Sequence, residues 1–280
     1  MEVDSKIIVV PWDFTPVTEY ALQHAIKISL MTRNDVCLLH IVEKITSDGG
    51  MKAKQAAMEN RGAEVERRFG VKVVTHVTRG TIFKQIPEFV NDRKASLVVM
   101  GTHGMSGMQK LTGSWALKVI AKSKVPYIVV QAPPEDNERY HNIVFPVDFR
   151  SEEKEKLSMA IFMGKYFDSK IHILKAVRKD DSLAKKTNLN LNYTVRMLIQ
   201  NNIEYEIGEV QADNLGERTL EIANEMKADL ILIMTTKDIT FADFVFGAKE
   251  QYIIANSSKI PICCVNPTSA FANLGQFMYG

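Results

Sequence analysis

The chain has 280 residues, of which 46% are hydrophobic and 24% charged, and its 35 basic and 33 acidic residues leave a net charge of +2. This length fits one large domain or two of ordinary size, and a charge so near neutrality gives no electrostatic surface for nucleic acid. No apolar stretch approaches the roughly 20 residues of a membrane span, and the beginning, MEVDSKIIVVPWD, lacks the pattern of a secretion signal. We expect a cytoplasmic protein that contacts neither nucleic acid nor membrane.

Short apolar runs alternate with amphipathic segments along the first half of the chain. The runs are continuous and rich in β-branched residues, which is typical of strands covered on both faces of a parallel sheet. The first helix is expected to have Thr15 as its N-cap and Pro16 at its first position. The expected strands are 6–11, 36–42, 71–78, 96–101 and 126–131, and the later helices are at about 50–69, 81–93 and 112–123.

The second half repeats this order of elements. Alternating strands and helices predict an α/β protein of two tandem domains, each a five-stranded doubly wound parallel sheet with helices on both faces. The expected elements are 142–147, 151–167, 170–177, 182–201, 203–210, 215–227, 229–234, 247–257 and 261–265.

An internal repeat relates the two halves. Three separated blocks align at a constant offset of 135: KIIVVPWDF with NIVFPVDF, VCLLHIVEK with IHILKAVRK, and SKVPYIVV with SKIPICCV. Such self-similarity indicates a duplicated domain. The polar stretch 133–138 reads as a linker, so we expect domains at 1–138 and 139–267 and a tail at 268–280 whose role stays open.

A glycine-rich segment follows the fourth expected strand and leads into a helix. It reads GTHGMSGMQKLTGSW from Gly101 to Trp115. Glycines let backbone N–H groups approach a ligand, and a helix beginning near Ser114 directs the positive end of its dipole to the same place. These features suit a phosphate, although glycines in such a turn are often purely conformational. His103, inside the segment, is either a phosphate ligand or a surface histidine.

Asp13 ends the first expected strand. It is either a turn carboxylate near Thr15 or a hydrogen-bond acceptor for a ribose hydroxyl or a base amino group. Doubly wound sheets bind small molecules outside the carboxyl ends of their strands, where strand order reverses. Asp13 and the glycine-rich segment are therefore expected at one crevice. The three cysteines, Cys37, Cys263 and Cys264, predict neither a disulfide framework nor a metal site.

These segments together resemble the universal stress protein family. The resemblance rests on VVPWDFTPVTEYAL, LLHIVE, VVMGTHGMSGMQKLTGS and SKVPYIVVQ, and it covers essentially the whole chain as two tandem family domains. It implies a five-stranded parallel sheet between helices, pairing of domains and, in one subgroup, binding of ATP or AMP through a G-x2-G-x9-G-[ST] motif.

Carried over by position, the resemblance implies a nucleotide site of ten residues. Pro11, Asp13 and Ile41 would flank the adenine and ribose. The residues around the phosphates would be Met100, Gly101, His103, Gly104, Gly113, Ser114 and Trp115. The expected cofactor is ATP or AMP, either alone or together with Mg²⁺. No catalytic or metal-ligating residue is expected.

Both copies depart from the family motif. Eight residues, not nine, separate Gly104 from Gly113. In the second copy the matching region runs from Met234 to Lys237 and then to Gly247-Ala248, so two glycines and the serine are missing. We expect that site to be empty or altered, although Asp148 remains and leaves a nucleoside or smaller ligand open there.

Three functions compete. The leading one is a cytoplasmic stress-response protein that binds an adenine nucleotide in its first domain as sensor or carrier. The second is a slow ATPase, for which no catalytic base is identifiable. The third is a nucleotide-free interaction protein that acts through its domain-pairing surface. The resemblance also implies that the fifth strands, 127–130 and 262–265, pair within one chain as a pseudo-dimer, and it leaves open whether two such chains form a homodimer.

Overall fold

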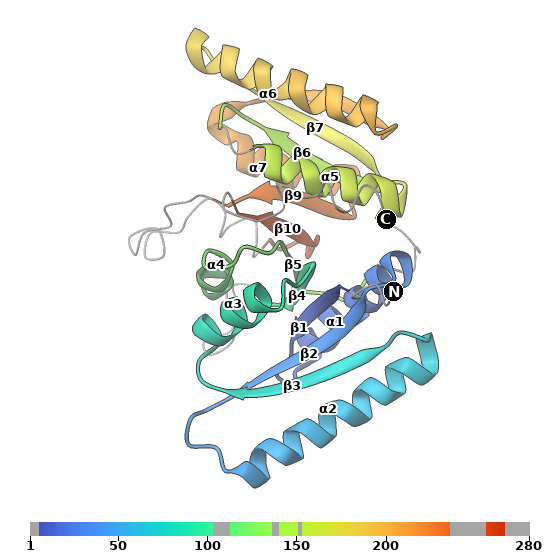
Figure 1. Ribbon diagram of the computed structural model, residues 1–280. Coiled ribbons are helices and arrows are strands. Elements are labelled where there is room, and N and C mark those ends of the chain that lie inside the picture. The colour runs from blue at the N-terminus through green and yellow to red at the C-terminus, as the bar shows by residue number, and fades with distance from the viewer. Residues whose placement is uncertain (1–5, 103–112, 136–139, 151–152, 236–255, 267–280) are drawn as a thin grey trace. The chain divides into compact units, whose positions relative to one another are not determined.

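A computed structural model describes residues 6–102, 113–135, 140–150, 153–235 and 256–266, and for residues 113–115 and 153–155 it describes the backbone alone (Figure 1). The chain divides into two compact units, unit 1 from Met1 to Asp136 and unit 2 from Asn137 to Gly280. The domain bounds expected from the sequence stay a prediction. No helix in the described ranges is both long and apolar enough to cross a membrane.

Unit 1 is a parallel sheet with helices between successive strands. Its strands run in the order β3-β2-β1-β4-β5, so the strand order reverses between β1 and β4. The helices α3 and α4 pack on each other, while α1 packs on β1 and β4. The elements are β1 Ile7–Pro11, α1 Pro16–Thr32, β2 Asp35–Val42, α2 Asp48–Phe69, β3 Val73–Arg79, α3 Ile82–Asp92, β4 Leu97–Gly101, α4 Gly113–Ile120 and β5 Tyr127–Val130.

Unit 2 repeats this topology with its own parallel sheet, in the order β8-β7-β6-β9-β10. The elements are β6 Asn142–Val147, α5 Glu153–Phe167, β7 Lys170–Val177, α6 Asp181–Gln200, β8 Tyr205–Gln211, a short 3-10 turn at Ala212–Asn214, α7 Leu215–Glu225, β9 Leu230–Met234 and β10 Ile262–Val265. The prediction of two tandem five-stranded α/β domains is confirmed.

The repeat extends to backbone details. The strands β1, β2 and β5 lie 135 residues from their counterparts, whereas β4 and β9 differ by 133 because the segments before them differ in length. Helix ends in both units use a left-handed residue, which lets a helix stop abruptly. The equivalent pairs are Arg33 with Asp168, Gly70 with Asn202, and Lys94 with Lys227.

The core lies between each sheet and its helices, and here one sequence expectation is wrong. The central strands are buried on both faces, but β3 and β8 are half exposed, with Val74 38% and Ile207 47% accessible. These two are the outer strands of their sheets, and the end of a sheet is covered less completely than its middle. The continuous apolar runs therefore predicted where the strands lie, but they did not predict how deeply each strand is buried.

Candidate functional site

The candidate site of unit 1 lies where β1, β2 and β4 end. Side chains alternate between the two faces of a strand, and β1 pairs in register with β4 through Ile8 with Leu97. Continuing this register puts Pro11, Ile41 and Met100 on one face of the sheet and His40 on the other. Pro11 and Met100 are buried and Ile41 is half-buried. Three of the residues expected around a nucleotide thus share one face at the switch point.

Asp13 is exposed and shapes the turn between β1 and α1. Its Oδ1 accepts hydrogen bonds from the backbone N–H of Thr15, at 2.9 Å, and from the Thr15 hydroxyl. Thr15 occupies the N-cap position, as expected, but its side chain bonds Asp13 and does not cap the helix. The expected turn role of Asp13 is thereby observed, and it uses only one carboxylate oxygen among the described contacts.

Phe14 follows Asp13 with a backbone φ of 66°, a left-handed conformation that bulky residues rarely adopt. Its ring lies edge-on to His40, with centroids 5.0 Å apart, and Lys54 Nζ lies 4.4 Å from its centroid. Nδ1 of His40 is 2.6 Å from the carbonyl oxygen of Trp12. Burial lowers the pKa of His40, and nearby Lys54 adds to this while the Trp12 carbonyl and Asp13 oppose it. The Trp12 carbonyl and the Phe14 ring therefore hold the His40 ring against this turn.

Gly101, at the end of β4, faces the first turn of α1. A Cβ at this position would lie 2.3 Å from the carbonyl oxygen of Val17, closer than any real contact. Packing between β4 and α1 therefore requires this glycine whether or not a ligand is present. Thus the first glycine of the motif has a structural role in the fold.

The phosphate end of the expected site is described only in part. Gly113 is the first residue of α4, as the sequence predicts, and the beginning of a helix presents N–H groups without partners in the helix. His103 and Gly104 lie outside the described residues, and so do the side chains of Ser114 and Trp115. Their roles stay predictions.

Two buried polar groups at this edge have no hydrogen-bond partner among the residues that the structure describes. They are Nε1 of Trp12, a residue that is 7% exposed, and Oγ1 of Thr102, which is 1% exposed. Thr102 directly follows β4 and Trp12 directly follows β1. Sequence reasoning missed both, because the partners of a buried polar atom come from segments that are distant along the chain.

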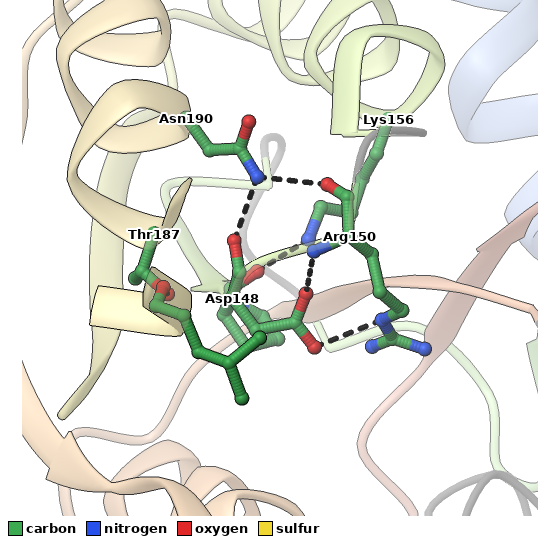
Figure 2. A network of polar contacts seen from close by, with 7 residues as sticks. Asp148, Arg150, Lys156, Thr187 and Asn190 are labelled. Carbon is green, nitrogen blue, oxygen red and sulfur yellow. Dashed lines mark hydrogen bonds and ion pairs between the residues drawn. The ribbon is translucent and has the colours of Figure 1, made fainter. Parts of the chain in front are cut away.

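The equivalent edge of unit 2 is occupied by its own side chains, as Figure 2 shows. Asp148 is 6% exposed and accepts hydrogen bonds from the backbone N–H of Arg150 through Oδ1 (2.9 Å) and from Arg150 Nε through Oδ2 (2.8 Å). Asn190, on α6, donates through Nδ2 to the carbonyl oxygens of Asp148 and Arg150, each at 2.7 Å. Both carboxylate oxygens of Asp148 are therefore engaged within the fold.

Lys156 fills a further part of this edge. It is 1% exposed, donates to the carbonyl oxygen of Pro146, and holds its Nζ 4.3 Å from the ring centroid of Phe145. The offset of 135 makes its counterpart Ala21, which is also fully buried. A lysine thus stands where unit 1 has a methyl group.

The described part of the chain contains neither a metal-binding cluster nor a reactive thiol. There, no group of three or more His, Cys, Asp or Glu side chains could hold a metal ion. All three cysteines are buried thiols outside any disulfide, and burial raises the pKa of the Cys37 thiol to about 12. A thiol with so high a pKa is an unreactive core residue.

The comparisons with known proteins agree on one family. The model of the Universal stress protein family matches residues 5–131. Universal stress protein MJ0531 of Methanocaldococcus jannaschii is 30% identical over 144 aligned residues, which cover 47% of this chain and 85% of that protein. Universal stress protein MJ0577 of the same organism is 28% identical over 159 aligned residues, covering 47% and 98%.

Solved structures show the same fold over both units. A universal stress protein from Archaeoglobus fulgidus superposes with a TM-score of 0.73 at 15% identity, covering 93% of this chain and 96% of that one. A putative universal stress protein from Pseudomonas aeruginosa gives a TM-score of 0.64 at 17% identity, covering 99% and 98%. At such low identity these matches establish the architecture alone.

Proposed function

Because the chain belongs to the universal stress protein family, we propose that unit 1 binds an adenine nucleotide, ATP or AMP, as a sensor or carrier in a stress response. The cytoplasmic location is part of this proposal. The observation that best supports this proposal is the difference between Asp13 and Asp148, the aspartates that follow the first strand of each unit. Asp13 is exposed with one oxygen committed to its own turn, whereas Asp148 is buried with both oxygens on Arg150.

The surroundings of Asp13 support an adenine nucleotide. Pro11, Ile41 and Met100 give an apolar surface on one face of the sheet, suited to a flat base. An exposed carboxylate beside them suits a ribose hydroxyl or an amino group, since both donate hydrogen bonds. The N-terminus of α4, at Gly113, suits the phosphates. Mg²⁺ is not part of the proposal, because nothing among the described residues calls for it.

The first experiment releases small molecules from freshly purified protein and identifies them by mass spectrometry, followed by calorimetric titration with ATP and AMP. The test variant is Asp13→Asn, which keeps Oδ1 for the Thr15 turn but replaces Oδ2 by an amide donor. It is expected to weaken binding about tenfold or more, as loss of a hydrogen bond to a charged group does.

The matched control is Asp148→Asn in unit 2. It breaks the ion pair with Arg150 and is expected to lower stability while leaving nucleotide affinity unchanged. If ATP and AMP give no heat and none is released, the proposal fails. Turnover of ATP well above background, abolished by a single substitution, would instead favour the slow ATPase.

A second candidate function is a nucleotide-free interaction protein. It is favoured by Gly101, whose presence packing against α1 already explains, and by unit 2, which has kept the fold while filling its own site. In this alternative the pairing of β5 with β10, and of whole chains, is the function. Cross-linking between the two strands, combined with the absence of nucleotide binding, is the result that would establish it.

A further inference from the structure

Phe14 and Phe149 occupy equivalent places in the two units, but their backbones differ. Each follows an aspartate at the end of the first strand, Asp13 or Asp148, and the two phenylalanines lie 135 residues apart. Phe14 has a φ of 66°, whereas Phe149, which lies within the described ranges, does not have a positive φ. A left-handed backbone is strained for a phenylalanine, and such strain gathers where function requires it. The strain therefore belongs to unit 1 and not to the repeated fold.

The partners of the Phe14 ring hold its backbone in this conformation. The ring lies edge-on to Trp12 and to His40, with centroids 6.1 and 5.0 Å away, and Nζ of Lys54 lies 4.4 Å from its centroid. Edge-to-face aromatic pairs and a cation over a ring are both stabilising contacts. These contacts therefore offset the cost of the left-handed backbone.

Unit 2 lacks both of these aromatic partners. The positions that match them at the offset of 135 carry Val147 and Lys175. Phe149 has instead the guanidinium group of Arg178 above its ring, 4.7 Å from the centroid. Without edge-on aromatic neighbours at these two positions, its backbone takes an ordinary φ.

The two backbones present the preceding aspartate differently. In both units its Oδ1 accepts a hydrogen bond from the backbone N–H two residues on, that of Thr15 or of Arg150, at 2.9 Å. Asp13 is exposed and uses only Oδ1 in its described contacts, whereas Asp148 is 6% exposed and its Oδ2 accepts from Nε of Arg150. The turn hydrogen bond is therefore the same, and the difference lies in whether the second oxygen is available.

We infer that Phe14 is a positioning residue of the nucleotide site. Its left-handed backbone, held by Trp12 and His40, keeps Asp13 exposed with Oδ2 available to accept a hydrogen bond from the ribose or the base. Phe14 acts through Asp13 and is not one of the ten residues that the family resemblance implies. This inference rests on the proposed function of unit 1.

The test separates the backbone of residue 14 from its ring in the full-length chain. Phe14→Ala and Phe14→Gly both remove the ring, but only glycine adopts a positive φ without strain. In calorimetric titrations with ATP and with adenosine, Phe14→Ala is expected to weaken binding of both about tenfold, as loss of a hydrogen bond to a charged group does. Phe14→Gly is expected to bind both several-fold more tightly than Phe14→Ala. Phe149→Ala is the matched control and leaves both affinities unchanged.

A double variant shows whether Phe14 acts through Asp13. In the Asp13→Asn background, Phe14→Ala is expected to weaken ATP binding by no more than about twofold, because the group that it positions is already gone. A loss as large as in the wild-type background overturns the inference. Equal affinities of Phe14→Ala and Phe14→Gly also overturn it, while the proposed function stands. Absence of ATP and AMP binding by the wild type removes both.

Stability without nucleotide gives an independent readout of the strain. In urea unfolding followed by far-UV circular dichroism, Phe14→Gly is expected to be at least as stable as Phe14→Ala, because alanine keeps the strain of a positive φ. At position 149 the order is expected to reverse, since glycine there only adds freedom to the unfolded chain. Greater stability of the alanine variant at both positions would show that residue 14 is not strained and would overturn the inference.

Discussion

The buried histidine of α1 shows how a single residue makes unit 1 sensitive to pH. His24 is 2% exposed, and its Nε2 is 3.2 Å from the carbonyl oxygen of Ala132. Burial lowers the pKa of His24 from 6.5 to about 4, an effect that Lys27 increases and the Ala132 carbonyl opposes. The folded chain therefore keeps this ring neutral at pH values where an exposed histidine is charged.

The sign of the resulting pH dependence follows from linkage. Between pH 6.5 and about 4 the unfolded chain binds a proton that the folded chain does not, so the free energy of unfolding falls as pH is lowered through this window. A loss of about 2 kcal/mol is expected between pH 7 and pH 5. Urea unfolding followed by tryptophan fluorescence measures it.

His24→Leu serves as the control for this pH dependence. It is expected to lose less stability than the wild type over the same interval, although not zero, because burial also lowers the pKa of His40 and of His76. An equally steep pH dependence in His24→Leu would assign the effect to other groups.

At the scale of elements, the close contact between β4 and α1 explains why a glycine is needed at position 101. Gly101→Ala puts a methyl group against the carbonyl oxygen of Val17 and is expected to cost about 1–3 kcal/mol as α1 is pushed away. Gly49→Ala, on α2, is the control because nothing lies within 4 Å of its added Cβ, and it is expected to be neutral or stabilising. Fluorescence-monitored urea unfolding compares the two, and equal effects would contradict the packing role.

The elements themselves were largely predictable, because periodicity and turn chemistry act locally. Strand β2 falls within a residue of its expected bounds and helix α1 begins at Pro16 as expected, and the register then brings Pro11, Ile41 and Met100 together. The burial of β3 was not predictable, since it depends on a place at the end of the sheet.

The less predictable part of the site depends on contacts between distant segments. The packing role of Gly101 needs the approach of Val17 on α1, a residue far from it along the chain. Likewise, the sequence shows Lys156 in place of Ala21 but not that its ammonium group bonds the carbonyl oxygen of Pro146.

At the scale of the whole molecule, the proposal makes the two units respond differently to nucleotide. Both tryptophans, Trp12 and Trp115, belong to unit 1, so tryptophan fluorescence follows that unit. ATP at about 100 times its Kd is expected to stabilise unit 1 by about 2.7 kcal/mol. Unit 2, whose Asp148 is already ion-paired, is expected to gain nothing.

Thermal unfolding with and without ATP checks this difference. The midpoint of the fluorescence signal is expected to rise, while the far-UV circular dichroism signal, to which both units contribute, keeps a component that does not move. A common shift of the whole circular dichroism signal would contradict independent responses of the two units.

The buried Lys156 also bears on the history of the duplication. Since Lys156 and Met234 are buried in unit 2 at the positions where unit 1 has Ala21 and Gly101, restoring either small residue alone would open a cavity in unit 2. Each of these two reversions is expected to cost stability before it brings any gain in binding. A second equivalent site in this chain would therefore need several positions of unit 2 to change together.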